Sequence, residues 1–385
     1  MPITKKPGLY FDENVEYEFT GSGAKIPVII GKTGNTGSND YKVDGTQVLT
    51  FKNYSEANRS IANGGIGTDT ATNPTLAFLE EFFEESAITS SDQLGVDHIY
   101  VIDVGNGTVK NSWITALTTA KTLLDVGVEV YVSADAIEDY TLSAFLAGAN
   151  ASIKTETANL NLRVAMATKT GATDQELATL ASTTGVPSSR LYLCEPLLFG
   201  KTVARFCTTP YYIEPGYPTY RTVEAGIFKP RTNAEILTLQ NAGVVINTDE
   251  RVDDEIYPRI NLSVSTAFSQ NPRPADSLGH ARFNADHLLR EIFKAIFPQV
   301  KDNESGTNIA KRQTAINSVI DDEVEAERII AYNSNNGQGT KLTLLESDSQ
   351  PYDMELVGQI QPINCTIAIN IRAKIKNAAI VAVET

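Results

Sequence analysis

Hydrophobic and polar residues alternate along the C-terminal end of the chain, from about residue 352 to residue 385. The apolar members of this stretch occupy every second position, and they are Ile363, Cys365, Ile367, Ile369, Ile371, Ala373 and Ile375. Successive side chains of an extended chain point to opposite faces, so the pattern predicts a long, half-buried β-strand.

A short apolar run with Ile380, Val381 and Val383 follows this stretch and ends the sequence. Chain ends normally fray unless other groups hold them, and unpaired apolar β-formers invite pairing with another chain. The run favours two interpretations about equally. It is either a strand donated to a neighbouring subunit or an edge strand of the chain's own sheet.

The N-terminal segment, residues 1–22, carries a second alternation of the same period. Val15, Tyr17 and Phe19 are separated by Glu16 and Glu18. This pattern predicts another extended arm with one apolar face. We therefore expect strand-like arms at both ends of the chain.

Between about residues 23 and 195, strand and helix patterns take turns along the chain. Strands are predicted over 26–30, 98–104, 128–132, 160–167 and 190–194, and helices over 75–88, 113–124, 137–149 and 174–183. This order is typical of a mostly parallel sheet covered by helices, which is a Rossmann-like α/β layer.

The second half begins with residues 200–232, which are rich in proline, tyrosine and glycine and predict loops at a domain junction. Helices are predicted over 234–242, 276–297 and 309–329. Short strands are predicted over 244–246, 259–267 and 342–345. The helix over 276–297 has the clearest apolar stripe and stops at Pro298.

Length and charge narrow the class of protein. A chain of 385 residues is long enough for two or three domains. The 47 acidic residues exceed the 32 Lys and Arg residues and give a net charge of -15, which argues against binding to nucleic acid or to anionic membranes. The sequence has neither an apolar run long enough to span a membrane nor the apolar core of a secretory signal. Its three cysteines fit neither a disulfide framework nor a metal site.

The sequence presents no catalytic constellation. Gly31-Lys32-Thr33 mimics the end of a phosphate-binding loop, but Ile26 stands where that loop needs its first glycine, so a surface turn is favoured. The acidic residues of the helix over 75–88 favour a solvated face over a metal site. The two histidines of the helix over 276–297 have no carboxylate partner in its pattern. We expect no enzymatic activity, no cofactor and no metal site.

Four stretches of the chain resemble the sheath protein of contractile tails, which are found in tailed phages, R-type pyocin-like particles and related contractile injection systems. These stretches are Pro7-Gly8-Leu9-Tyr10 with the strand after it, residues 239–245 with Arg251 and the strand over 260–266, the helix over 276–297, and Gly358-Gln359-Ile360-Gln361-Pro362 with the alternating strand. Residues from about 30 to 230 resemble the family only in size and α/β class.

The resemblance implies a fold of class α/β and α+β. A Rossmann-like α/β middle domain (residues 23–230) would be inserted into a C-terminal α+β sheath core domain (residues 231–376). Strand arms formed by residues 1–22 and 377–385 of neighbouring subunits would complete the sheet of that core.

The resemblance also implies a function and a set of partners. The chain would polymerise with itself as stacked hexameric rings around an inner tail tube, bounded by baseplate and tail terminator proteins. It would contract to drive the tube through a target cell envelope. The expected location is a virion or tail-like particle assembled in the host cytoplasm, with no nucleic-acid partner and no membrane insertion.

Three groups of residues are the candidate sites under this reading. The arms would pair through Val15, Tyr17, Phe19, Ile380, Val381 and Val383. The acceptor strand would present Ile363, Ile367, Ile369 and Ile371. Lys311 and Arg312, at the start of a helix, are candidate contacts to an acidic tube. The alternative is an enzyme or small-molecule-binding protein with a Rossmann-like α/β core.

Overall fold

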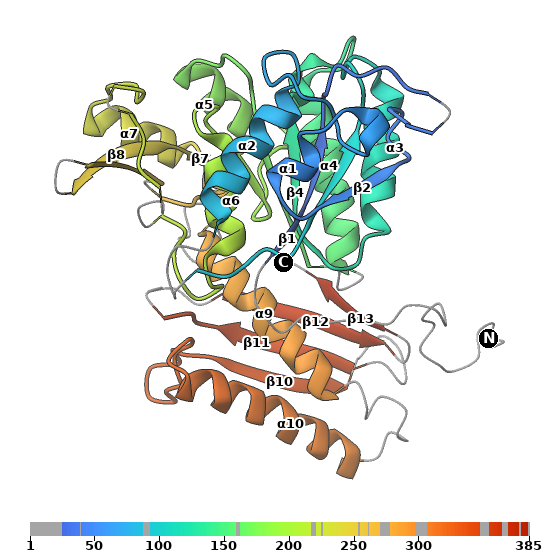
Figure 1. Cartoon of the computed structure of the whole chain (residues 1–385). Helices are drawn as coiled ribbons and strands as arrows, with labels where there is room; N and C mark the ends of the chain where they lie inside the picture. The colour runs from blue at the N-terminus through green and yellow to red at the C-terminus, as the bar shows by residue number, and fades with distance from the viewer. Residues whose placement is uncertain are drawn as a thin grey trace.

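The chain folds around a seven-stranded sheet, a four-stranded sheet and a two-stranded ribbon (Figure 1). The structure is a computed structural model. It describes residues 25–38, 40–87, 93–158, 162–216, 221–224, 226–252, 255–260, 262–269, 278–296, 306–346, 354–363, 369–376 and 379–383.

The seven-stranded sheet has the order β2-β3-β1-β4-β5-β6-β7. β2 pairs with β3 in the antiparallel sense, and all other neighbours pair in the parallel sense. The strands are β1 (Ile26–Gly31), β2 (Val48–Phe51), β3 (Ile99–Asp103), β4 (Val126–Val132), β5 (Val164–Thr168), β6 (Leu191–Cys194) and β7 (Val244–Val245). The predicted, mostly parallel sheet is confirmed.

The central strands are apolar throughout because both of their faces are covered. Val28 and Ile30 of β1 belong to the apolar core on one face of the sheet, and Ile29 between them belongs to the core on the other face. Strands buried on both faces read as continuous apolar runs, as is usual for parallel sheets.

Helices cover both faces of this sheet. One face packs against α1 (Tyr54–Ala57), α2 (Pro74–Ser86) and α6 (Phe199–Thr208). The other face packs against α3 (Lys110–Lys121), α4 (Leu142–Ala158), α5 (Asp174–Ser182) and α7 (Asn233–Asn241). Short 3-10 turns are η1 (Ile61–Asn63), η2 (Ala134–Ala136) and η3 (Thr266–Ser269). We call this sheet with its helices the α/β body.

The C-terminal layer lies below the α/β body in Figure 1. Its antiparallel sheet has the order β10 (Lys341–Glu346), β11 (Met354–Ile360), β12 (Ile369–Lys376) and β13 (Ala379–Val383). The helices α9 (Gly279–Ile296) and α10 (Gly306–Glu325) pack on it. Leu288 of α9, Ile316 of α10, and Leu344 and Leu356 of the sheet share one apolar core.

The helix α9 belongs to both parts of the molecule. Its Phe283 lies in a core of the α/β body, and its Leu288 and Ile292 lie in the core of the C-terminal layer. This double burial explains why apolar residues recur along the whole length of this helix.

A two-stranded ribbon extends from the α/β body. β8 (Asn247–Val252) and β9 (Glu255–Ile260) pair antiparallel over their whole length. Pro258 lies in β9, a position that proline tolerates because this strand has a free edge.

The structure corrects four sequence-based boundaries. The loop predicted from residue 200 contains α6, whose apolar residues Phe199, Val203 and Phe206 recur at helical spacing. The helix predicted from residue 137 begins at Leu142, because Asp139 adopts a left-handed conformation with φ 53°. The strand predicted over 259–267 ends at Ile260. The sheet of the α/β body continues to β7, beyond the strand and helix alternation predicted up to about residue 195.

The lack of a side chain at Gly358 allows β10 and β11 to lie close together. A Cβ atom at this position would overlap the carbonyl oxygen of Lys341 on the paired strand. We expect Gly358→Val to break the pairing of β10 with β11 and to expose residues 341–346 to hydrogen exchange, while the α/β body stays protected. Gly148→Ala is the control, because a Cβ there meets only an ordinary contact at 3.6 Å. Unchanged protection of residues 341–346 in Gly358→Val would contradict the expectation.

Candidate functional site

The carboxyl ends of β1 and β3 lie side by side in the parallel sheet. Here Asp103 is buried and accepts hydrogen bonds from Thr33 Oγ1 (2.7 Å to each carboxylate oxygen) and Tyr41 OH (2.6 Å). Asn35 Nδ2 and the Gly105 N–H also donate to this carboxylate, at 3.3 and 2.7 Å. Burial and the neighbouring Asp103 raise the pKa of Tyr41, which keeps it a neutral donor. The polar groups beside the ends of these two strands thus bind one another.

The sequence Gly31-Lys32-Thr33 forms a packed turn beneath the start of α2. The backbone N–H and the hydroxyl of Thr75 donate to the Lys32 carbonyl, at 3.1 and 2.7 Å. A Cβ at Gly31 would overlap the Thr75 hydroxyl, so the glycine serves this close contact. The N-terminal turn of α2 therefore binds a backbone carbonyl where a phosphate-binding loop would bind an anion.

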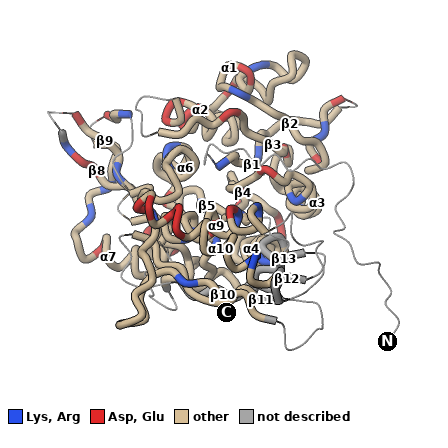
Figure 2. The backbone as a smooth tube through the Cα atoms, turned by 90° about the horizontal axis from the view of Figure 1, so that it is seen from below, with Lys and Arg blue, Asp and Glu red and all other residues tan. Residues whose placement is uncertain are grey.

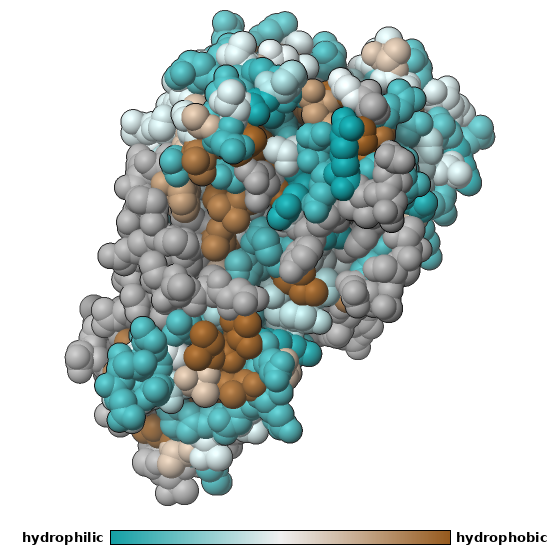
Figure 3. Space-filling view, turned by 90° about the vertical axis from the view of Figure 1, so that its left-hand side faces the viewer, coloured by the Kyte–Doolittle hydropathy of each residue, from teal (hydrophilic) through white to brown (hydrophobic). Residues whose placement is uncertain are grey.

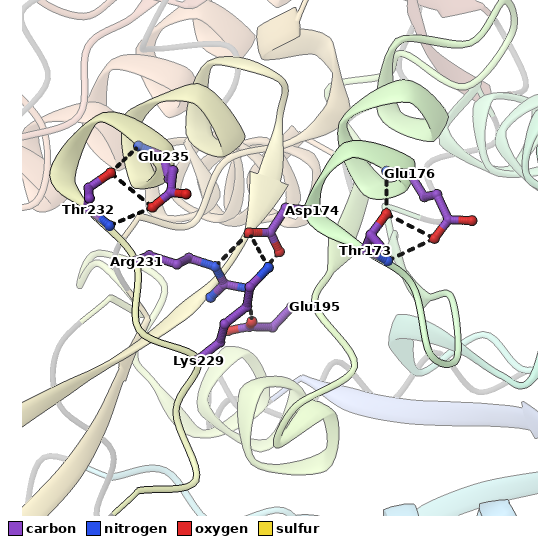
Figure 4. Close-up of polar contacts among 8 residues, drawn as sticks. All are labelled: Thr173, Asp174, Glu176, Glu195, Lys229, Arg231, Thr232 and Glu235. Carbon is purple, nitrogen blue, oxygen red and sulfur yellow. Dashed lines mark hydrogen bonds and ion pairs between the residues drawn. The ribbon is translucent and has the colours of Figure 1, made fainter.

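A second polar cluster ties α5, α7 and β6 together (Figure 4). Arg231 donates two hydrogen bonds to Asp174, at 3.0 and 2.9 Å, and a third to Glu195 at 2.9 Å. Hydrogen bonding from Arg231 lowers the pKa of Asp174, whereas burial raises the pKa of Glu195. Asp174 begins α5 and Glu195 follows β6, so Arg231 fixes these elements beside α7.

The α/β body is joined to α9 by a buried ion pair. Arg190, just before β6, donates from both terminal nitrogens to Asp286 of α9, at 2.7 and 2.8 Å. The two side chains are only 1% and 4% exposed. Two-pronged pairing of a guanidinium with a carboxylate is strong and sets the orientation of both groups.

Further buried contacts extend this joint along the same edge of the sheet. Arg290 of α9 donates to the carbonyl of Leu162, and burial lowers the pKa of Arg290. Arg163, at the start of β5, is buried and pairs with Glu129 of β4 at 2.8 Å. Tyr131 donates to the other Glu129 oxygen at 2.6 Å. α9 is thus bound to the sheet through polar groups that are themselves fixed inside it.

Lys25 supports the joint from the first described residue of the chain. Its ammonium group donates to the carbonyls of Phe206 and Thr209, at 2.9 and 2.7 Å, and lies 4.3 Å from the centre of the Phe283 ring. Burial lowers the pKa of Lys25 to about 7. A neutral amine still has two N–H donors, which is enough for both carbonyls.

The histidines of α9 have carboxylate partners that no local sequence pattern indicates. His280 Nδ1 lies 2.5 Å from Glu214 Oε2, and His287 Nε2 lies 3.4 Å from Glu323 Oε1. His287 also stacks on Tyr211 with a centroid distance of 3.7 Å. Across the described residues, no group of three or more His, Cys, Asp and Glu side chains is arranged to hold a metal ion.

The structure describes some of the predicted arm and acceptor residues and not others. Val15, Tyr17, Phe19 and Ile367 lie outside the described residues. Ile369 and Ile371 lie on β12, and Ile380, Val381 and Val383 lie on β13. Ile363 precedes β12, and its N–H donates to the carbonyl of Arg328 at 3.2 Å.

Within the single chain, β13 pairs antiparallel with β12 of the same sheet. The register runs from Lys376 opposite Ala379 to Arg372 opposite Val383. Of the two open interpretations, this is the arrangement of an edge strand of the chain's own sheet. Donation of the strand to a neighbour stays a prediction.

The two candidate tube contacts differ in exposure. Lys311 of α10 is exposed, whereas the side chain of Arg312 is buried and interacts within the chain. Basic and acidic positions are interspersed along the described backbone (Figure 2). Only Lys311 of the pair thus presents its charge at the surface.

No protein-family model matches the sequence, and no curated protein gives a significant match. Solved structures do match over nearly the whole chain. A sheath tail protein from Listeria innocua aligns with a TM-score of 0.61 and 7% identity, covering 92% of this chain and 96% of its own. A sheath tail protein from Desulfitobacterium hafniense aligns with a TM-score of 0.59 and 12% identity, covering 96% and 100%. The chain has the fold of these sheath proteins.

A third match comes from an assembled particle. The helical sheath of the anti-feeding prophage, solved in its contracted state, aligns with a TM-score of 0.54 and 12% identity. The alignment covers 100% of this chain and 97% of the sheath protein. The shared fold therefore includes both the α/β body and the C-terminal layer. No helix among the described residues is long and apolar enough to cross a membrane.

The pair Arg190–Asp286 can be tested by a double-mutant cycle. Asp286→Leu leaves the Arg190 guanidinium buried without its carboxylate, and we expect the free energy of unfolding to fall by about 3–5 kcal/mol. Adding Arg190→Met should restore much of this loss, because two apolar side chains then fill the site. Urea unfolding measures both values. Arg259→Met removes an exposed pair with Glu250 and should change stability little. A loss in the double variant equal to the sum of the losses in Asp286→Leu and Arg190→Met measured singly would contradict a coupled pair.

The lowered pKa of Lys25 predicts that the stability of the protein depends on pH. Its pKa of about 7 lies below the ordinary value of 10.5, so the unfolded chain binds more protons between these two pH values. The free energy of unfolding contributed by this site should therefore rise with pH across that window. Lys25→Met should remove this part of the rise, as measured by denaturant unfolding at several pH values. Identical pH slopes for the wild type and Lys25→Met would show that Lys25 stays charged.

Proposed function

We propose that this chain is the structural subunit of a contractile tail sheath. It polymerises as stacked hexameric rings around an inner tube and contracts to drive the tube through a target cell envelope. The observation that carries the proposal is the match to sheath proteins over more than nine-tenths of the chain, including a sheath in its contracted helical form. The division into an outer α/β domain, a C-terminal core domain and two strand arms is part of the same proposal.

Subunits are held together in this proposal by exchanged strands. The pairing of β13 with β12 uses backbone groups, so the same segment of a second copy would make the same hydrogen bonds. Each backbone hydrogen bond contributes about 0.5–1.5 kcal/mol. Residues 1–22 of a second neighbour would supply the other strand.

The exposed surface of the C-terminal layer supports contacts between subunits. Ile330 and Tyr332 lie between α10 and β10 and are 37% and 41% exposed, and Leu345 lies on β10 and is 47% exposed. Figure 3 shows apolar atoms gathered in the lower part of the molecule, which is this layer. Apolar patches rimmed by polar groups are typical of surfaces that bind other proteins.

Contraction in this proposal uses energy stored during assembly and no nucleotide. The polar groups that would bind a phosphate at the carboxyl ends of β1 and β3 are engaged within the chain. Lys311 is the candidate contact to an acidic inner tube, and baseplate and terminator proteins bound the polymer. The particle is virion-like or tail-like and is assembled in the host cytoplasm.

Deletion of residues 378–385 tests strand exchange. The deletion removes β13, and we expect the subunit to stay folded while assembly is lost. Purified protein is examined by negative-stain electron microscopy and size-exclusion chromatography. The wild type should form hollow ridged tubes at high concentration. Deletion of residues 384–385 leaves β13 complete and should leave assembly unchanged.

Two results would count against this function. Tubes formed equally well without residues 378–385 would refute exchange of the C-terminal strand. A wild-type protein that stays a small closed oligomer at every concentration would refute the sheath function and favour a small-molecule-binding α/β protein.

A further inference from the structure

The free edge of β10 is occupied by a side chain of α10. β10 is an outer strand that pairs with β11 on one side only. On its other side, the Leu344 N–H donates to Gln313 Oε1 at 2.8 Å, and Gln313 Nε2 donates to the Leu342 carbonyl at 3.0 Å. Both bonds are backbone bonds that an added strand would otherwise make.

The amide of Gln313 reproduces one residue of a parallel strand. In a parallel pair, a residue donates its N–H to one carbonyl of its partner and accepts from the N–H two residues further along. Gln313 makes this pair of bonds on either side of Thr343. A third backbone group near this end of β10 is also engaged, because the Thr340 N–H donates to the Ile330 carbonyl at 2.7 Å. The Thr340 N–H, the Leu342 carbonyl and the Leu344 N–H are therefore all engaged by groups of the chain itself.

Gln313 is held in this position from both directions. Its Nε2 also donates to Asn317 Oδ1 at 2.9 Å, one turn further along α10. Ile316 and Ile320 of the same helix are buried in the core shared with β10 and β11. Because α10 is fixed against the sheet, the Gln313 side chain loses little further conformational entropy when it binds the β10 edge.

The opposite side of the sheet is built differently. β12 and β13 are joined by backbone pairing, which an identical segment of a second copy can replace bond for bond. We infer that Gln313 closes the β10 edge to strand addition, so that a second copy of this chain joins the sheet only from the β12–β13 side. This inference rests on the proposed function and specifies the direction in which strands are exchanged.

The test compares Gln313→Ala with Thr314→Ala. Thr314 is the next residue of α10, but its side chain is exposed and its hydroxyl donates to the Ala310 carbonyl of the same helix. Hydrogen exchange of residues 341–346 is measured by mass spectrometry before and after tube formation. In the unassembled Gln313→Ala variant, we expect the Leu344 amide to exchange about tenfold faster, the factor that corresponds to one lost hydrogen bond. We also expect concentration-dependent side-by-side association of Gln313→Ala, whereas Thr314→Ala should behave as the wild type.

Tube formation by the wild type should leave the exchange of residues 341–346 unchanged, because this edge receives no strand. Increased protection of these residues in tubes would overturn the inference, as would wild-type exchange in unassembled Gln313→Ala. If no variant forms tubes, the proposed function fails. The exchange and association of unassembled Gln313→Ala, relative to Thr314→Ala, then still decide whether the glutamine closes the edge.

Discussion

The arrangement of the two layers depends on a carboxylate that is kept from water. Asp286 lies on α9 between the α/β body and the C-terminal sheet, and a buried charge is tolerated only with a partner charge and hydrogen bonds. Arg190 provides both, from a backbone position just before β6. Because two bonds must form at once, only one placement of α9 against the sheet satisfies the pair.

The apolar contacts of α9 extend this constraint. Phe283 packs into the core of the α/β body and Leu288 into the core of the C-terminal layer, so sliding one layer over the other would open both cores. Large movements between subunits should then change the contacts at their edges and leave the joint within each subunit intact. The proposed sheath function requires this division between a fixed body and exchangeable edges, because subunits of a contracting sheath move while they stay connected.

The sequence alone predicts those helices and strands whose buried residues recur at a regular spacing. The apolar run of β1 and the stripe of α9 were predicted because each element buries its own side chains at a regular spacing. The helix α6 was missed because the prolines and tyrosines that follow it dominate the segment. The pair Arg190–Asp286 has no local signal, because its members lie 96 residues apart. The pairing of β13 also could not be decided, because identical backbone bonds form within a chain or between copies.

The two edges of the C-terminal sheet differ in the free energy needed to replace the group that now binds there. At β13, a copy of the same segment restores every bond that it displaces, so exchange between chains is nearly balanced within the sheet and is decided by the contacts made elsewhere. At β10, an incoming strand must displace the Gln313 amide, which would then bind water. The net gain is only the difference between the bonds of the new strand and the two bonds of Gln313. In the proposed sheath, this difference would direct strand addition to the β12–β13 side of the sheet. Here it follows from one amide placed on a helix that the core holds still.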